Sequence, residues 1–345
     1  MGVLNIAIKE FEVGIRTKRF YATIFMFFIL ALVSIKTTNM FRGDSPITLN
    51  IEQLYNTPFQ VLFLSSFASA FNYAIALLGI LLGATSINQE IRDGTIKLLY
   101  SKPIYRDTII WGKLLGSILT IAVTVGLFYV FMVGIALIFG KPVTGYDISR
   151  LLALYPFTVL YGLAFYSLGL LLSVLIKTPI NSLVAGVLAF IFIAIIIPVI
   201  IAPLAAFVIA GSPQISYSPA EFQMSNISNG STVAYEVAYN PFEDKEFMEW
   251  MDKYMNVYRK ITYISLTQDF GEIIGIMFGR KTTEDILSAM GQLFSIEEEG
   301  NYKLVEERSI GEAISLVMGN IAALFISIFI FLIPAYLKFA KIDLR

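Results

Sequence analysis

Residues 180–210 read INSLVAGVLAFIFIAIIIPVIIAPLAAFVIA and contain no Asp, Glu, Lys or Arg. A bilayer core about 30 Å thick is crossed by about 20 apolar residues in an α-helix, so this segment is long enough to span a membrane. The whole chain of 345 residues is similarly apolar, with 57% hydrophobic residues, only 15% charged residues and a mean hydropathy of +0.73. This composition predicts an all-α integral membrane protein.

Five further long stretches lack charged side chains, and together with residues 180–210 they predict six transmembrane helices. Pro198 and Pro203 predict a kink or a re-entrant end in the fifth of these spans. Lys18 and Arg19 precede the first stretch, as they would in a cleaved signal peptide, but the long charged leader favours a retained span. The five further stretches are residues 20–35, 59–87, 114–139, 151–176 and 313–337.

Basic residues are distributed unequally between the two sides of these spans. Thirteen Lys and Arg residues flank the spans on the side that carries both termini, and four flank them on the other side. Because cytoplasmic loops are enriched in Lys and Arg, we expect a multi-pass protein of the cell membrane with both termini in the cytoplasm.

The sequence thus divides into four parts. Residues 1–19 precede the first span, residues 20–211 hold spans one to five, residues 212–309 form an extracytoplasmic domain, and residues 310–345 hold the sixth span and a cytoplasmic tail. In the first part, Leu4, Ile8, Phe11 and Ile15 share one helical face. This pattern predicts an amphipathic helix in the cytoplasmic membrane interface, with a soluble cap helix as the alternative.

The extracytoplasmic part is expected to be mainly helical. Phe247, Trp250, Met251 and Tyr254 lie at helical spacing, and a second helix is expected over residues 283–294. Residues 212–240 are rich in Ser, Asn, Gly and Pro, which predicts loops and a short strand.

Two local patterns in this part leave their function open. Asn226 and Asn229 each begin a glycosylation acceptor triplet, whose occupancy the sequence does not decide. The acidic run 297–299 is compatible with cation binding, but the regular oxygen spacing and the turn glycine of a calcium loop are missing, which favours a solvated loop.

The absence of Cys and His excludes several kinds of chemistry. No disulfide, thiolate nucleophile, imidazole base or ordinary zinc site can form without these residues. The net charge of −1 also argues against nucleic acid as a partner. We therefore expect a protein that is not an enzyme and that has no metal site or cofactor of its own.

The longest cytoplasmic loop, residues 88–113, reads NQEIRDGTIKLLYSKPIYRDTIIWGK and connects the second and third spans directly. Gly94 permits a sharp reversal, and Pro103 ends one short helix before the next begins. The loop is therefore expected to present a short helix to the cytoplasm. The alternative is a basic interfacial loop whose charges only fix the topology.

The order of residues in this loop resembles the permease subunits of type-2 ABC transporters. The resemblance extends to the N-terminal segment with Lys9, Glu10 and Arg16 and to the tail at residues 339–344, but not to residues 212–309. The residues that carry it are Glu90, Gly94, Thr95, Leu98, Leu99, Pro103, Arg106, Gly112 and Lys113.

The resemblance implies a half-transporter that pairs with an identical or related permease and works with separate ABC ATPase subunits. The helix at residues 90–100 would be a coupling helix seated on the ATPase, where Glu90 would meet a basic or polar partner and Arg106 an acidic one or a lipid phosphate. The chain has no Walker pattern, so ATP would be bound by the partner subunits. Family precedent favours export, while cargo, direction and homo- or heterodimer stay undetermined.

Four polar residues within the spans are candidates for a translocation path: Asn72, Asn181, Asn320 and Tyr161. Hydrogen bonding between helices is the alternative role for the asparagines. Two other functions stay open: an ion-coupled secondary carrier, and a membrane-anchored receptor or assembly protein whose external domain binds a ligand. The lack of ionisable side chains within the predicted spans argues against the carrier.

Overall fold

The structure, a computed structural model, describes residues 2–40, 56–64, 68–94, 106–213, 222–226, 232–236, 244–281 and 305–341. These residues are nearly all helical, and five helices among them are long and apolar enough to cross a membrane. The prediction of an all-α membrane protein is therefore confirmed. One antiparallel hairpin, β1 (Phe222–Asn226) and β2 (Thr232–Glu236), lies where a short strand was expected.

The five long helices correspond to the second to sixth predicted spans. They are formed by α4 (Ala68–Gly83) with its extension into α5 (Asn88–Arg92), α7 (Arg106–Ile138), α8 (Gly145–Leu175), the continuous segment Pro179–Ala210, and α15 (Met318–Lys341). The first predicted span lies in α2 (Lys18–Met40), where the apolar stretch Phe20–Val33 is shorter. A count of six spans therefore stays a prediction.

Several helices extend beyond the apolar stretches that predict them. α8 begins at Gly145 rather than at residue 151 because a capping box starts it. Asp147 Oδ2 accepts from the Thr144 backbone N–H at 2.9 Å, and Asp147 Oδ1 accepts from the Thr57 hydroxyl at 2.7 Å. Capping satisfies the free N–H groups of the first turn and so extends the helix into polar sequence.

The second predicted span begins with a separate short helix. α3 (Pro58–Leu62) starts at Pro58 with its own capping box between Thr57 and Gln60. The buried Gln60 side chain also donates to the backbone carbonyl of Phe278, which lies far away in sequence. The N-terminal end of this span is thus tied to a segment that follows the fifth span.

The fifth span stays helical through both prolines. α9 (Pro179–Ile191) continues into a π-helix, η3 (Phe192–Ile201), which contains Pro198, and then into α10 (Ala202–Ala210), with Pro203 in its first turn. The expected disruption therefore takes the form of a π-helix, in which wider hydrogen-bonded turns accommodate the proline.

The core is formed where α4 and α8 lie backbone to backbone. A Cβ atom added to Gly79 would lie 2.4 Å from the Gly162 carbonyl oxygen, and one added to Gly83 would lie 2.3 Å from the Tyr166 carbonyl oxygen. Small residues at such spacing allow membrane helices to approach this closely. Around this contact, Phe27 of α2 stacks on Phe128 of α7 with ring centroids 4.0 Å apart.

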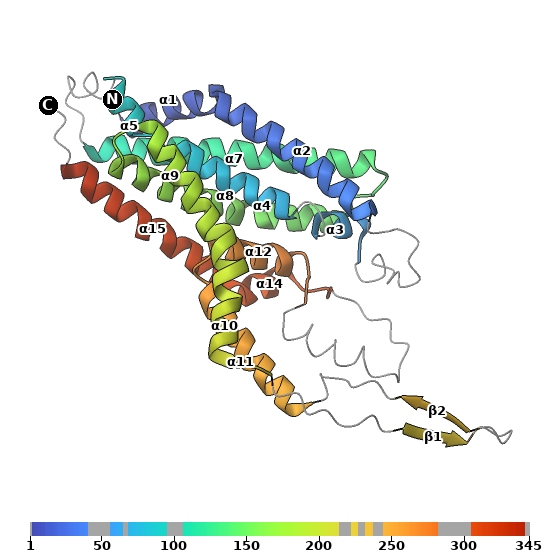
Figure 1. Cartoon of the computed structure of the whole chain (residues 1–345). Coiled ribbons are helices and arrows are strands. Elements are labelled where there is room, and N and C mark those ends of the chain that lie inside the picture. The colour runs from blue at the N-terminus through green and yellow to red at the C-terminus, as the bar shows by residue number, and fades with distance from the viewer. Residues whose placement is uncertain are drawn as a thin grey trace.

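α1 (Val3–Arg16), α5 and the C-terminal end of α15 lie at one end of the bundle (Figure 1). At the other end of α15 lie α12 (Leu266–Met277) and α14 (Ile310–Leu316). α10 and α11 (Lys245–Thr262) point away from the bundle toward the hairpin (Figure 1). α11 confirms the helix expected from Phe247, Trp250, Met251 and Tyr254.

α12 packs against α4, α8 and α15, although the sequence places it within the extracytoplasmic part. Its Phe270, Ile273, Ile274 and Met277 are buried, and Phe270 stacks on Tyr161 of α8 at 4.3 Å. Part of residues 212–309 therefore belongs to the helical bundle. The second expected helix, residues 283–294, as well as Asn229 and the acidic run 297–299, lies outside the described residues.

Candidate functional site

The predicted coupling residues begin on α5, where α4 turns toward α7. Ser173 of α8 holds this turn by accepting from the backbone N–H groups of Ile87 and Asn88 at 2.9 and 3.1 Å. Gly94 follows with φ +70°, the left-handed conformation that suits glycine and the expected reversal. Arg106 opens α7, whereas Thr95, Leu98, Leu99 and Pro103 lie outside the described residues.

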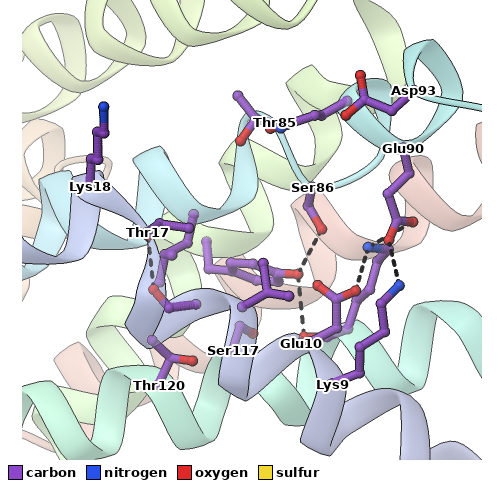
Figure 2. Close-up of a pocket in the computed structure, with 16 residues that line it drawn as sticks. Lys9, Glu10, Thr17, Lys18, Thr85, Ser86, Glu90, Asp93, Ser117 and Thr120 are labelled. Carbon is purple, nitrogen blue, oxygen red and sulfur yellow. Dashed lines mark hydrogen bonds and ion pairs between the residues drawn. The ribbon is translucent and has the colours of Figure 1, made fainter. Parts of the chain in front are cut away.

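Lys113 and its charged neighbours form a buried cluster at this end of the bundle. The Lys113 side chain is only 2% exposed, and its Nζ lies 3.0 Å from Glu10 Oε1 and 3.0 Å from Glu90 Oε2. Lys9 Nζ lies 3.6 Å from Glu90 Oε1 on the exposed side. We call Lys113, Glu10, Glu90 and Lys9 the Lys113 cluster; Figure 2 shows these contacts. It joins α1, α5 and α7.

Glu90 was expected to meet a basic or polar partner on an ATPase subunit, and that contact stays a prediction. Its two basic partners, Lys9 and Lys113, lie in its own chain. The reason is the burial of Lys113, because an ammonium group removed from water needs opposite charges and hydrogen bonds close by. Glu90 therefore positions α5 through ion pairs with α1 and α7.

α1 reaches Lys113 because glycines line the contact with α7. A Cβ atom added to Gly112 would lie 2.6 Å from the Ile6 Cβ, and one added to Gly116 would lie 2.5 Å from the Glu10 Cβ and 2.8 Å from the Ala7 carbonyl oxygen. Glycines four residues apart form a flat stripe that allows such close packing. Gly112 thus seats α1 on α7.

The face of α1 that packs against α7 is not the predicted apolar face. Leu4 and Ile8, which define the predicted apolar face, are 67% and 46% exposed, while Ile6, Ala7 and Gly14 are buried against α7. α1 therefore packs on α7 through Ile6, Ala7 and Gly14 and leaves Leu4 and Ile8 at the surface. This is the surface that an interfacial helix presents to lipid.

A cavity of about 550 Å³ opens beside the Lys113 cluster, between α1, α4, α5, α7 and α8 (Figure 2). Thr85, Ser86 and Tyr166 line its wall near Lys113, and Lys18 and Asp93 also line it. The Tyr166 hydroxyl donates to the Lys113 backbone carbonyl at 3.4 Å and lies 3.4 Å from the Ser86 hydroxyl. Tyr166 thus joins the turn after α4 to the start of α7 through its hydroxyl.

Three of the four candidate path residues converge on α12. The Asn72 side chain donates to the Thr267 carbonyl at 2.9 Å, and the Tyr161 hydroxyl donates to the Asn72 carbonyl at 3.3 Å. The Asn320 side chain donates to Asp269 Oδ1 at 2.9 Å. These are contacts between helices, as the alternative role predicted. Asn181 lies apart from them, exposed at the start of α9.

The residues in and next to α12 that receive these contacts were not predicted from the sequence. Asp269 is only 2% exposed, and Ser265 donates from its hydroxyl to the Ile193 carbonyl in the π-helix at 2.7 Å. The apolar spacing of Phe270, Ile273 and Met277 was a signal for a buried helix face. Among the described residues, no group of three Asp, Glu, Cys or His side chains could hold a metal ion.

The hydrogen bond of Asn72 to α12 can be tested by substitution, with Asn181 as the control position. Replacing Asn72 with alanine is expected to lower the free energy of unfolding by about 1 kcal/mol, because an interhelical hydrogen bond is lost. The Asn181→Ala change is expected to stay within about 0.5 kcal/mol, because Asn181 is exposed. Unfolding curves in detergent measure both effects, and equal effects would contradict the role of Asn72.

Comparison with known families adds one finding. A family model described as ABC-2 family transporter protein matches residues 4–344, from the first turn of α1 to the C-terminal tail. The match includes the Lys113 cluster, the five long helices and α12. No curated protein matches the chain significantly.

Proposed function

The chain belongs to the ABC-2 transporter family, and we propose that it is the membrane permease subunit of an ATP-driven exporter. Family membership implies association with the membrane and with ABC ATPase subunits. In the proposed complex, two permease subunits pair, identical or related, and two separate ATPase subunits bind below them. ATP is bound and hydrolysed on the ATPase subunits, whereas this chain supplies the path for the cargo.

The Lys113 cluster is the observation that carries this proposal. The segment expected to contact the ATPase runs from α5 to the start of α7, and Lys113 ties its two ends together through Glu90. Glu10 adds α1 to the same unit. A push on the loop is therefore transmitted together to the end of the α4–α5 segment, to the start of α7 and to α1. Packed helices joined by ion pairs are one means by which coupling travels between distant sites.

α8 supports the proposal by contacting both the Lys113 cluster and α12. Its Tyr166 contacts Lys113, and its Tyr161 contacts Asn72 and, at 3.5 Å, the Thr267 hydroxyl of α12. The two tyrosines are five residues apart, about 7.5 Å along a helix. A shift of α7 at the Lys113 cluster can thus reach α12 through one rigid helix.

The proposed orientation places α1, α5 and the end of α15 in the cytoplasm and α11, β1 and β2 outside. The distribution of basic residues supports this orientation. Thirteen Lys and Arg residues flank the spans on the side that carries the termini, and only four flank them on the other side. The glycosylation triplets at Asn226 and Asn229 would then lie outside the cell.

One observation favours the ion-coupled carrier as a second candidate. Asp269 is a buried carboxylate beside a long apolar helix, the kind of group that ion-driven transport uses. Transport into vesicles separates the two functions. The exporter requires ATP and the ATPase subunit, whereas the carrier works with an ion gradient alone.

Co-purification tests the proposed partner. We expect a Walker-type ATPase encoded beside this chain to co-purify with it, and the Leu98→Ala/Leu99→Ala variant to lose most of the bound ATPase. The matched control is Leu137→Ala/Leu152→Ala, which shortens two exposed leucines at the far ends of α7 and α8. The control should bind ATPase normally. Unchanged binding in the loop variant would contradict the coupling assignment.

A further inference from the structure

A cavity of about 200 Å³ lies between α11, α12 and the start of α15. Figure 1 shows α12 and α14 at the opposite end of α15 from α5. Asp269, Glu272, Tyr258, Tyr263 and Asn320 are among the residues that line it. Pockets for whole drug-sized molecules start at about 300 Å³, so this cavity has the size of a single functional group of a ligand.

Asp269 is the buried acceptor of this cavity. Its side chain is only 2% exposed, and its Oδ1 accepts from Asn320 at 2.9 Å. Its Oδ2 is buried without a hydrogen-bond partner among the described residues. A buried carboxylate oxygen without a donor is costly, and it is stabilised by a cation or by a proton. Burial raises the pKa of Asp269 to about 7, against the smaller opposing effect of the Asn320 hydrogen bond.

The other charged groups around the cavity leave this acceptor available. Glu272 on the same helix pairs with Arg280 at 2.7 Å. Arg259 of α11 lines the cavity from an exposed position, and Leu316, Val317 and Asn320 of α14 and α15 contribute no charge. Tyr258 and Tyr263 supply aromatic rings, whose faces attract organic cations.

We propose that this cavity binds the ammonium group of an organic amine at Asp269. An ammonium group has three donors on a compact cation, so it can donate to Asp269 Oδ2 and lie near the tyrosine rings. Asn320 holds the carboxylate through Oδ1, and Oδ2 has no donor among the described residues, so the ammonium group would supply it. In the proposed exporter this amine is part of the cargo, and that last step rests on the proposed function.

Thermal unfolding of the purified full chain with benzylammonium tests the site, with benzyl alcohol as the uncharged probe of similar shape. A ligand that binds only the folded state raises the unfolding midpoint. At pH 8 we expect benzylammonium to raise the midpoint of the wild type, and benzyl alcohol to leave it unchanged. Asp269→Asn should abolish the benzylammonium shift, while the matched control Asp252→Asn, an exposed residue of α11, should keep it.

The wild type alone provides a second test, because a proton competes with the amine. Since the pKa of Asp269 lies at about 7, benzylammonium should bind at least about tenfold more weakly at pH 5.5 than at pH 8. Equal shifts at both pH values, an equal shift with benzyl alcohol, a shift retained in Asp269→Asn or no shift in the wild type would each overturn the proposal. This measurement contains no ATPase, so its failure leaves the co-purification test unaffected.

Discussion

The Lys113→Met variant is expected to lose about 3 kcal/mol of its free energy of unfolding. Lys113 is 2% exposed and is the common partner of Glu10 and Glu90, whose side chains are 19% and 16% exposed. Removal of the ammonium group leaves two carboxylates close together in a poorly hydrated site. Both carboxylates then repel each other, and α5 loses its tie to α7.

Lys9→Met is the matched control for this experiment. Lys9 also pairs with Glu90, but at 3.6 Å and with a side chain that is 51% exposed. An exposed ion pair contributes about 0–1 kcal/mol, so the control should unfold almost like the wild type. Denaturant unfolding in detergent measures both variants. Equal losses in the two variants, or no loss in Lys113→Met, would show that the cluster does not hold these helices together.

Gly116→Leu is expected to have the second largest effect and to separate α1 from α7. Even a Cβ atom at Gly116 would lie 2.8 Å from the Ala7 carbonyl oxygen, so the rest of a leucine side chain cannot fit without moving backbone. Overpacking of this kind costs about 1–3 kcal/mol. Displacement of α1 also moves Glu10 away from Lys113. The loss of this ion pair then adds to the cost of overpacking at Gly116.

Gly126→Leu is the matched control, because Gly126 lies on the same helix and an added Cβ atom there meets nothing within 4 Å. The chain contains no cysteine, so an Ala7→Cys change introduces a single thiol at a position that is 1% exposed. Maleimide should modify this thiol slowly in the parent and in Gly126→Leu and rapidly in Gly116→Leu. Slow modification in Gly116→Leu would contradict the packing of α1.

The long helices could be predicted from sequence because a helix in lipid needs only length and the absence of charge. Residues 180–210 illustrate this, since they are apolar throughout and stay helical through Pro198 and Pro203. The residues at which the helices begin and end were harder to predict, because local capping hydrogen bonds determine them. α8, for example, begins at Gly145 because Thr144 and Asp147 form a capping box there. The polar residues before position 151 were not included in the predicted apolar span.

The candidate site was predicted in part. Glu90, Gly112 and Lys113 were identified by their order in the loop, but their roles depend on α1, which is about a hundred residues away in sequence. No pattern in the amino-acid sequence indicates that the side chain of Glu10 lies next to Lys113. The packing of α12 against the bundle was missed for a similar reason. Its charged residues Asp269 and Glu272 obscure the apolar face that packs into the bundle.

The central claim is that the Lys113 cluster transmits the work of an ATPase to this chain. ATP hydrolysis per bound ATPase subunit tests it most directly, measured on the co-purified complex in vesicles for the wild type, Lys9→Met and Lys113→Met. We predict that the wild type and Lys9→Met stimulate hydrolysis equally and that Lys113→Met, where the complex still forms, loses most of that stimulation. Full stimulation by a folded Lys113→Met complex would contradict the claim.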